Sequence, residues 1–182
     1  AYSPRSVSVS YNPLVPTAVL PQHQVPLGSS YTEVGDAALE ARIRTARASL
    51  GRRVVILGHH YQRDAIIQFA DLTGDSYQLS RDAAKQTEAE TIVFCGVHFM
   101  AESADILRRP HQQVLLPDLK AGCSMADMAP TDDAEECWDT LERAFPGETT
   151  PITYMNSTAA IKALCGRNGG VVCTSSNARA AF

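Results

Sequence analysis

Short apolar runs, most of them rich in β-branched residues, constrain the fold of this chain more than any other feature. Each run is three or four residues long and does not alternate apolar with polar residues, which is typical of strands buried on both faces of a sheet. Buried helices would need longer periodic segments. We therefore expect strands at 54–57, 92–95, 114–116, 152–154 and 171–173, with a weaker short strand at 70–73.

Helical segments separate these runs. The first, at 37–50, carries Leu39, Ile43, Ala46 and Leu50 at helical spacing, with charged residues between them. Because strands and helices alternate, the sequence predicts an α/β fold, in which a short parallel sheet is covered by helices on both faces in a three-layer α/β/α arrangement. Further helices are expected at 63–70, 77–87, 100–108, 132–145 and 157–165.

The two ends of the chain differ from the rest. Residues 1–34 carry five prolines among Ser, Val and Gln. Because each proline fixes φ and removes a backbone donor, we expect an extended N-terminal arm there. At the other end, the chain stops at Phe182, a few residues into what is expected to be a new helix after Asn177. We therefore expect the sequence to be a fragment.

Composition and charge argue against several classes of function. The net charge of −4 and the pI of about 5.7 do not fit a basic nucleic-acid-binding surface. No apolar run approaches the roughly 20 residues of a membrane span, and the N-terminus lacks the apolar core of a secretory signal. The five cysteines include no CxxC pair, so neither a disulfide scaffold nor a structural zinc site is expected. We expect a protein of the cytoplasm, or of a plastid after removal of a transit peptide, with reduced thiols.

Polar residues follow nearly every expected strand. In open parallel sheets, ligands bind outside the carboxyl ends of the strands. Several of these runs open directly into a helix, whose free N–H groups can bind an anion. The pattern predicts a site for a small, multiply anionic metabolite, and ordinary helix caps and turns are the alternative. The polar stretches lie at 58–62, 74–76, 96–100, 121–124, 155–156 and 174–177.

Individual side chains in these stretches suggest roles. His59 and Tyr61 are two residues apart in a loop, so they can share one face of a site, where a His binds an anion and a Tyr transfers a proton. His60 faces the other way, and we expect it to have only a structural role in the loop. Cys123 lies in a Gly-Cys-Ser loop and is an accessible thiol, a candidate ligand or nucleophile, with an ordinary loop residue as the alternative.

Other polar residues have more ordinary explanations. Ser76 and Ser175 can each cap a helix or bind an anion, and the two roles are compatible. Glu102 and Asp105 are three residues apart on one expected helix, and we expect them to form a solvated face. The remaining cysteines are expected to pack as small apolar side chains, except that Cys165 at a helix end stays ambiguous.

Six motifs, in order and with fitting gaps, closely resemble those of the quinolinate synthase family. The resemblance runs from about residue 51 to the end and does not cover the arm at 1–34. The motifs are HHYQ at 59–62, GDS at 74–76, FCGVHFMAESA at 94–104, AGCSMAD at 121–127, YMNSTAA at 154–160 and CTSSNA at 173–178.

The resemblance implies an activity and a cofactor. The family condenses iminoaspartate with dihydroxyacetone phosphate to give quinolinate, phosphate and water, in the biosynthesis of NAD. Its members carry one [4Fe–4S] cluster, whose open iron acts as a Lewis acid and whose three cysteine ligands come from three similar α/β domains. Cys123 matches the first of these ligands.

The resemblance also implies site residues and an organisation of the chain. Tyr61 matches a proton-transfer residue and His59 one that binds and polarises the substrate, while Ser76, Tyr154, Asn156 and Ser175 match positions that hold substrate carboxylate, carbonyl or phosphate groups. The implied division is a first domain at 35–130 and a partial second, similar domain at 131–182.

The full-length transferase is expected to be a homodimer, and this chain is expected to be inactive without the C-terminal half. The alternative is a metal-free anion-binding or scaffold module of the same fold.

Overall fold

A computed structural model describes residues 26–175 and 177–181, and its centre is a four-stranded parallel sheet. The strand order is β2-β1-β3-β4, so the chain runs outward from β1 to β2 and then returns to the other side of β1 for β3 and β4. The expected strands at 54–57, 70–73, 92–95 and 114–116 are therefore confirmed to within two residues. The strands are β1 (Val54–His59), β2 (Leu72–Gly74), β3 (Thr91–Cys95) and β4 (Gln113–Leu115).

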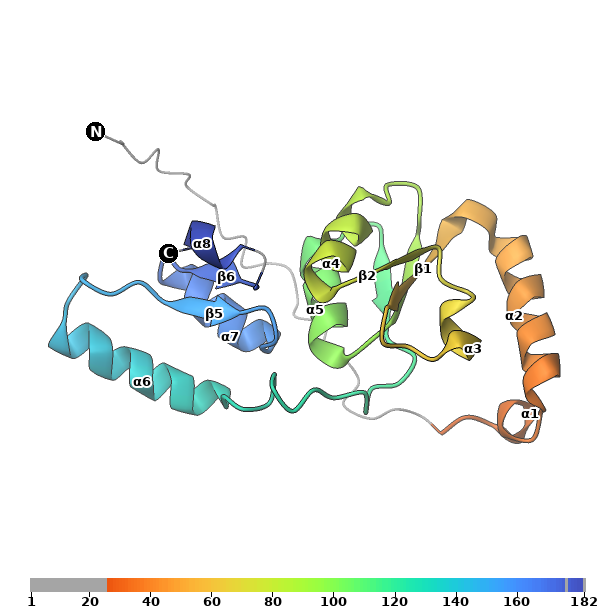
Figure 1. Ribbon diagram of the computed structural model, residues 1–182, viewed down its shortest axis with the longest axis horizontal. Coiled ribbons are helices and arrows are strands. Elements are labelled where there is room, and N and C mark those ends of the chain that lie inside the picture. Colours follow the sequence, from red (N-terminus) through yellow and green to blue (C-terminus); the bar gives the residue numbers. More distant parts are fainter. Residues whose placement is uncertain (1–25, 176, 182) are drawn as a thin grey trace.

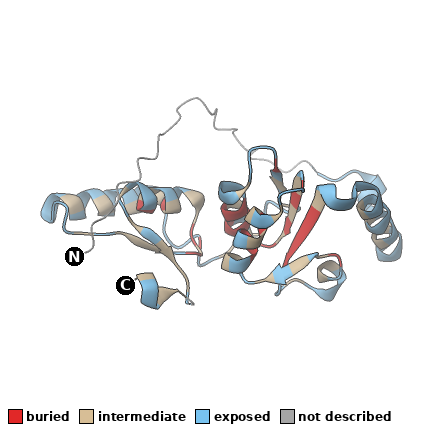
Figure 2. Ribbon diagram, turned by 90° about the horizontal axis from the view of Figure 1, so that it is seen from above, coloured by how far each residue is buried: buried red, intermediate tan, exposed pale blue. Residues whose placement is uncertain are grey.

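Helices cover both faces of this sheet, which confirms the three-layer α/β/α prediction. Helices α2 (Asp36–Leu50) and α3 (Asp64–Ile67) lie on one side, and α4 (Ser76–Lys85) and α5 (His98–Leu107) lie on the other (Figure 1). The core is formed between the sheet and α4 and α5, where buried residues are concentrated (Figure 2). No helix in the described part of the chain is long and apolar enough to cross a bilayer.

A short helix lies where the sequence suggested an extended arm. Helix α1 (Ser29–Thr32) packs beside α2, because Arg42 Nη1 donates to Ser30 O at 2.7 Å and the Arg42 guanidinium lies 4.5 Å above the Tyr31 ring. The prediction of an extended arm is therefore wrong for residues 29–32, and most of the prolines behind it lie outside the described residues. Proline spacing gave no signal for these side-chain contacts.

A second, two-stranded parallel sheet follows the long helix α6 (Thr131–Ala144). Its strands β5 (Ile152–Tyr154) and β6 (Val171–Cys173) are joined by α7 (Ala159–Arg167), and α8 (Ala178–Ala181) follows β6. Buried Met155 and half-buried Val172 pack into the core of the first sheet. The division into domains at 35–130 and 131–182 stays a prediction, since the two sheets are separate but share a core.

Gly58 fixes how closely α3 approaches β1. A Cβ at this position would lie 2.5 Å from Ile67 Cδ1 and 2.9 Å from the Ala70 side chain, so only glycine permits this packing without displacement. Gly58 immediately precedes His59, the last residue of β1. The absence of a side chain therefore helps set the position of the loop that follows the strand.

Candidate functional site

A small cleft lies at the carboxyl ends of β2, β5 and β6. Its volume is about 210 Å³. Strand ends from both sheets supply its walls, as expected for a ligand site in an α/β fold. Four of the five predicted substrate-binding residues line it, and the fifth, His59, does not. The lining comprises Asp75, Ser76, Tyr77, Tyr154, Met155, Asn156, Thr174 and Ser175.

The N-terminus of α4 borders the cleft. Ser76 is the first residue of this ten-residue helix, and the Asp75 side chain caps it by accepting a hydrogen bond from Gln78 N at 2.8 Å. The first N–H groups of a helix have no acceptor within the helix, and together with the helix dipole they favour an anion. The prediction that Ser76 caps the helix is therefore wrong, because Asp75 supplies the cap, whereas Ser76 remains placed to bind an anion at the helix start.

Tyr154 and Ser175 join β5 to the segment after β6. The Tyr154 hydroxyl and Ser175 Oγ are 2.9 Å apart and share a hydrogen bond, and both residues are exposed at the cleft. Ser157 Oγ donates to Tyr154 O at 2.8 Å, which fixes the turn after β5. The two hydroxyls therefore present a paired donor and acceptor to a ligand.

Cys123 does not line the cleft itself but contacts Asn156, which does. The Asn156 amide donates to Cys123 Sγ at 3.8 Å, and both residues are half-buried. The loop that carries Cys123 is held at its base, because His98 N donates to Ala121 O at 2.8 Å. The structure therefore brings the predicted metal ligand beside a predicted substrate-binding residue 33 positions later in the chain.

The other cysteines lie elsewhere, and none of the five is in a disulfide. Cys165 is buried, with Sγ donating to Pro151 O at 3.1 Å, and burial raises the pKa of its thiol. Burial also raises the pKa of the half-buried Cys95. Cys137 is exposed on α6, so the expectation that it packs in the core is wrong. Across residues 26–175 and 177–181, no group of three or more His, Cys, Asp or Glu side chains could hold a metal ion.

His59 and Tyr61 lie at the end of β1, and neither is among the residues that line the cleft. His59 is paired in register with Gly74, next to the Asp75 cap. Burial and the neighbouring His60 lower the pKa of His59, and Asp75 only partly opposes them, so the neutral form of the ring is favoured. Tyr61 is 83% exposed, and its ring centre lies 4.8 Å from that of His59. The structure thus places His59 near Asp75 but leaves Tyr61 facing solvent.

His60 does not face away from the other two side chains as expected, because its ring centre lies 4.5 Å from that of His59 and 4.3 Å from that of Tyr61. Its backbone N–H and its ring Nδ1 both contact Gly74 O, at 3.3 and 3.0 Å. These contacts tie the loop after β1 to the end of β2.

Sequence reasoning missed Glu102 and Lys162. Glu102 is half-buried rather than part of a solvated face, and its Oε2 accepts a hydrogen bond from Ala159 N at 2.8 Å. Lys162 Nζ donates to Ser157 O at 2.6 Å, and burial lowers the pKa of Lys162 to about 8 although Glu102 opposes the shift. No local pattern could identify these residues, because the contact of Glu102 lies 57 positions away.

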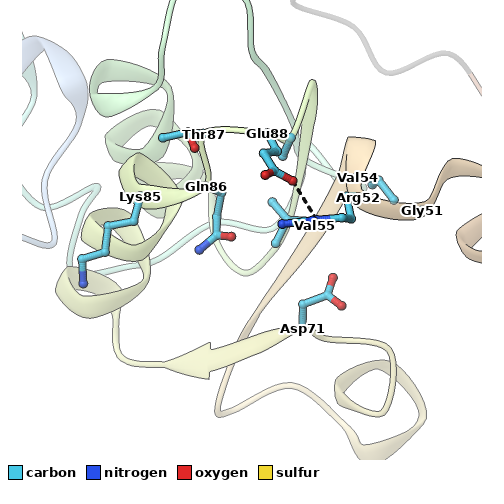
Figure 3. Close-up of a pocket in the computed structure, with 10 residues that line it drawn as sticks. Gly51, Arg52, Val54, Val55, Asp71, Lys85, Gln86, Thr87 and Glu88 are labelled. Atoms are coloured by element: carbon cyan, nitrogen blue, oxygen red, sulfur yellow. Dashed lines mark ion pairs between the residues drawn. The ribbon is translucent and has the colours of Figure 1, made fainter.

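A second polar hollow, of about 390 Å³, lies at the opposite, amino-terminal edge of the first sheet (Figure 3). Its charged side chains are paired within the protein. Arg52 Nε lies 2.7 Å from Glu88 Oε2, and Asp71 pairs with Arg47 while accepting a hydrogen bond from Ile56 N at 2.8 Å. These groups hold strands and helices together, and we assign the candidate site to the carboxyl edge.

Comparisons with known proteins identify the family. The family model described as Quinolinate synthetase A protein matches residues 41–182. The chain is 65% identical over 148 residues to a quinolinate synthase of Nocardioides sp., which covers 81% of this chain and 38% of that protein. It is 62% identical over 154 residues to the quinolinate synthase of Acidobacterium capsulatum (84% of this chain, 41% of that protein). It is 56% identical over 171 residues to that of Corynebacterium glutamicum (93% and 43%). The chain spans about two fifths of the length of the curated relatives it matches.

Proposed function

This chain belongs to the quinolinate synthase family, and from that premise we propose that it supplies part of the active site of an enzyme of NAD biosynthesis. The reaction is the condensation of iminoaspartate with dihydroxyacetone phosphate to give quinolinate, phosphate and water. The observation that carries the proposal is that Ser76, Tyr154, Asn156 and Ser175 meet in one cleft, although they come from three strand ends.

The cleft has the chemistry for anionic substrates. Hydroxyl and amide groups donate hydrogen bonds to carboxylate, carbonyl or phosphate oxygens, and the start of α4 adds its free N–H groups. Its volume of about 210 Å³ is below the roughly 300–1,000 Å³ of most ligand pockets. We therefore propose that these residues form one wall of a larger site, which the remainder of the complete enzyme closes.

His59 and Tyr61 take different roles in this proposal. A neutral His59 donates one ring N–H to a substrate oxygen and polarises it, which suits the lowered pKa of this side chain. Tyr61 moves a proton through its hydroxyl. Because Tyr61 is 83% exposed here, its proton transfer requires the rest of the enzyme to cover the loop after β1.

The described residues alone do not fit an iron–sulfur cluster. A [4Fe–4S] cluster is held by several cysteine thiolates, and in the described part of the chain Cys123 is the cysteine that reaches the cleft. We propose that Cys123 is one of three ligands and that the other two belong to the complete polypeptide. Bound there, the cluster would supply a Lewis acid beside the substrate. The Asn156 amide would then contact a ligating sulfur, an interaction that orients a metal ligand.

We further propose that this chain is inactive alone and that the complete transferase is a homodimer. We place it in the cytoplasm, or in a plastid, because its five cysteines are unpaired. No nucleic acid or membrane partner is included in the proposal.

Metal analysis tests the cofactor. Iron and acid-labile sulfide are measured per chain on anaerobically purified protein, for this chain and for a longer form of the same gene product. We expect about four irons on the long form and none on the short one. Cys123→Ser in the long form is expected to abolish iron binding, whereas Cys137→Ser, a change at an exposed cysteine on α6, is expected to retain it. Normal iron content in the Cys123 variant would reject the ligand assignment.

Turnover tests the role of Tyr61. In the long form, Tyr61→Phe removes only the hydroxyl, so we expect the cluster to remain and quinolinate formation to fall by about 10²–10⁴-fold, the range of general acid–base catalysis. Tyr31→Phe, a matched change at an exposed tyrosine of α1, is expected to have no effect. Unchanged turnover in the Tyr61 variant would remove this residue from the mechanism.

One observation favours the alternative of a metal-free anion-binding module. The cleft combines a helix start with paired hydroxyls and needs no metal to bind an anion. If neither form of the protein binds iron after reconstitution, then binding of inorganic phosphate to this chain, lost in Ser76→Ala, would support that module.

A further inference from the structure

We infer that Glu102 is a positioning residue, which holds the turn at 156–158 so that the Asn156 amide meets Cys123. The inference rests on the proposed function only in assigning Asn156 and Cys123 to the site. The inference otherwise depends on the contact between α5 and the start of α7, which is independent of the reaction that the enzyme catalyses.

The first contact is between Glu102 and the N-terminus of α7. Glu102 Oε2 accepts a hydrogen bond from Ala159 N at 2.8 Å, and Ala159 is the first residue of α7. The side chain of Thr158 already caps the same helix by accepting from Ile161 N at 3.3 Å. Glu102 therefore adds a carboxylate from another helix, at the helix end where negative charge is most favourable.

The second contact comes from the other side of the same turn. Lys162 Nζ donates to Ser157 O at 2.6 Å, and Lys162 lies one turn into α7. Glu102 acts electrostatically on Lys162, and its Oε1 lies 3.6 Å from His98 Nε2. The turn that carries Asn156 is thus held at Ser157 and at Ala159, and the charge of Glu102 favours both contacts.

The third contact places Cys123 against the same helix. His98 is the first residue of α5, and its backbone N–H donates to Ala121 O at 2.8 Å, two residues before Cys123. Glu102 lies one turn further along α5. A single turn of α5 therefore holds both loops, and the 3.8 Å contact between Asn156 and Cys123 is the product of that arrangement.

Two measurements on this chain test the inference without requiring a cluster or turnover. The alkylation rate of Cys123 by iodoacetamide is followed by mass spectrometry of the Cys123 peptide, and hydrogen exchange is followed in peptides that cover 155–162. The Asn156 amide lies 3.8 Å from the sulfur and donates to it, so we expect release of the turn to open access to the thiol. We expect Glu102→Ala to speed Cys123 alkylation by roughly three- to tenfold, which is the effect of one neutral hydrogen bond, and to speed exchange in the 155–162 peptides.

Matched variants separate positioning from a general loss of structure. Glu102→Gln keeps an oxygen that can accept from Ala159 N but loses the charge, so we expect it to restore most, though not all, of the slow alkylation. Asp105→Ala removes a carboxylate one turn away on the exposed side of α5, where it pairs with Arg108, and should leave Cys123 unchanged. Ala159→Pro removes the donor while keeping Glu102. Proline is tolerated at the first helical position, and Thr158 already has φ −67° and ψ 160°, which suit a residue before proline.

The outcomes are decisive. The inference is supported if Cys123 is alkylated fast in Glu102→Ala and Ala159→Pro but slowly in Glu102→Gln. It is also supported if Glu102→Ala has no further effect on the alkylation rate in an Asn156→Ala background. Wild-type alkylation in Ala159→Pro, or equal rates in the Gln and Ala variants of Glu102, would overturn it. A failure of the proposed function would instead appear as missing iron in the long form, with these thiol rates unaffected.

Discussion

Replacing Gly170 with alanine tests how tightly the second sheet packs against the segment before it. Gly170 lies between α7 and β6, and its backbone N–H donates to Cys165 O at 2.9 Å. A Cβ at this position would lie 2.0 Å from Pro151 O and 2.6 Å from Cys165 Sγ. Both contacts are far shorter than a van der Waals separation, and the closest atom belongs to the backbone. Alanine therefore cannot be accommodated by a side-chain rotation alone.

The magnitude follows from the contacts that must move. Pro151 O accepts hydrogen bonds from Val171 N at 3.2 Å and from Cys165 Sγ at 3.1 Å, and displacing Pro151 weakens both. Each such bond contributes about 0.5–1.5 kcal/mol, and overpacking itself costs about 1–3 kcal/mol. We expect Gly170→Ala to lower the free energy of unfolding by about 2–4 kcal/mol. For a chain of 182 residues this corresponds to a fall in Tm of roughly 4–16 °C.

Gly166→Ala is the matched control. Gly166 lies in the last turn of α7, is exposed, and has no atom within 4 Å of an ideal Cβ. Alanine is favoured over glycine in a helix by about 1 kcal/mol, so this variant is expected to be slightly more stable than the wild type. Urea unfolding followed by circular dichroism measures both. If Gly170→Ala unfolds at the same urea concentration as the wild type, the close approach of Gly170 to Pro151 is wrong.

Three further perturbations test other contacts by the same assay. The pKa of Lys162 is lowered from 10.5 to about 8, so the unfolded chain binds the proton of this side chain more tightly than the folded chain does. The free-energy cost of burying the charged amine is therefore fully present below pH 8 and disappears as the pH rises toward 10.5. Wild-type stability should therefore rise by about 1–2 kcal/mol relative to Lys162→Met across pH 8–10.5, after allowance for solvent screening, and parallel pH profiles would contradict this. Gln112→Met removes a buried amide that forms hydrogen bonds with Ala89 O at 2.9 Å and with two other backbone groups, so we expect the free energy of unfolding to fall by about 2–4 kcal/mol. A fall of less than about 1 kcal/mol would show that those backbone groups find other partners. Asp71→Ala leaves the buried Ile56 N–H without its 2.8 Å acceptor and should cost about 1–3 kcal/mol, which an unchanged urea midpoint would disprove.

Local sequence patterns predicted the strands and the candidate cleft because both are local in origin. Runs of β-branched apolar residues have few alternatives to buried strands, and the topology then places the residues after each strand at one edge of the sheet. Ser76, Asn156 and Ser175 were identified on this basis, and the structure brings them together. The assignment of Cys123 as a metal ligand came from the family resemblance, and its contact with Asn156 is consistent with it.

Contacts between distant segments could not be predicted. Glu102 sits on a helix at a spacing typical of a solvated face, and only the docking of α7 turns it inward. Helix α1 depends on the contacts of Arg42 with Ser30 and Tyr31, which no proline pattern encodes. Tyr61 follows a strand as the other site residues do, yet the loop after β1 leaves it exposed. In each case the deciding partner lies in another element.

The distribution of the cleft residues along the chain also determines when the cleft can exist. Ser76 and Ser175 line the same cleft but are separated by about 100 residues of sequence. During synthesis at about 5–20 residues per second, roughly 5–20 seconds pass between the appearance of the two residues. The first sheet and its helices can form in that interval, before Met155 and Val172 are available to pack into its core. During synthesis there is therefore a period in which the first sheet can be folded while the core lacks Met155 and Val172 and the cleft does not yet exist.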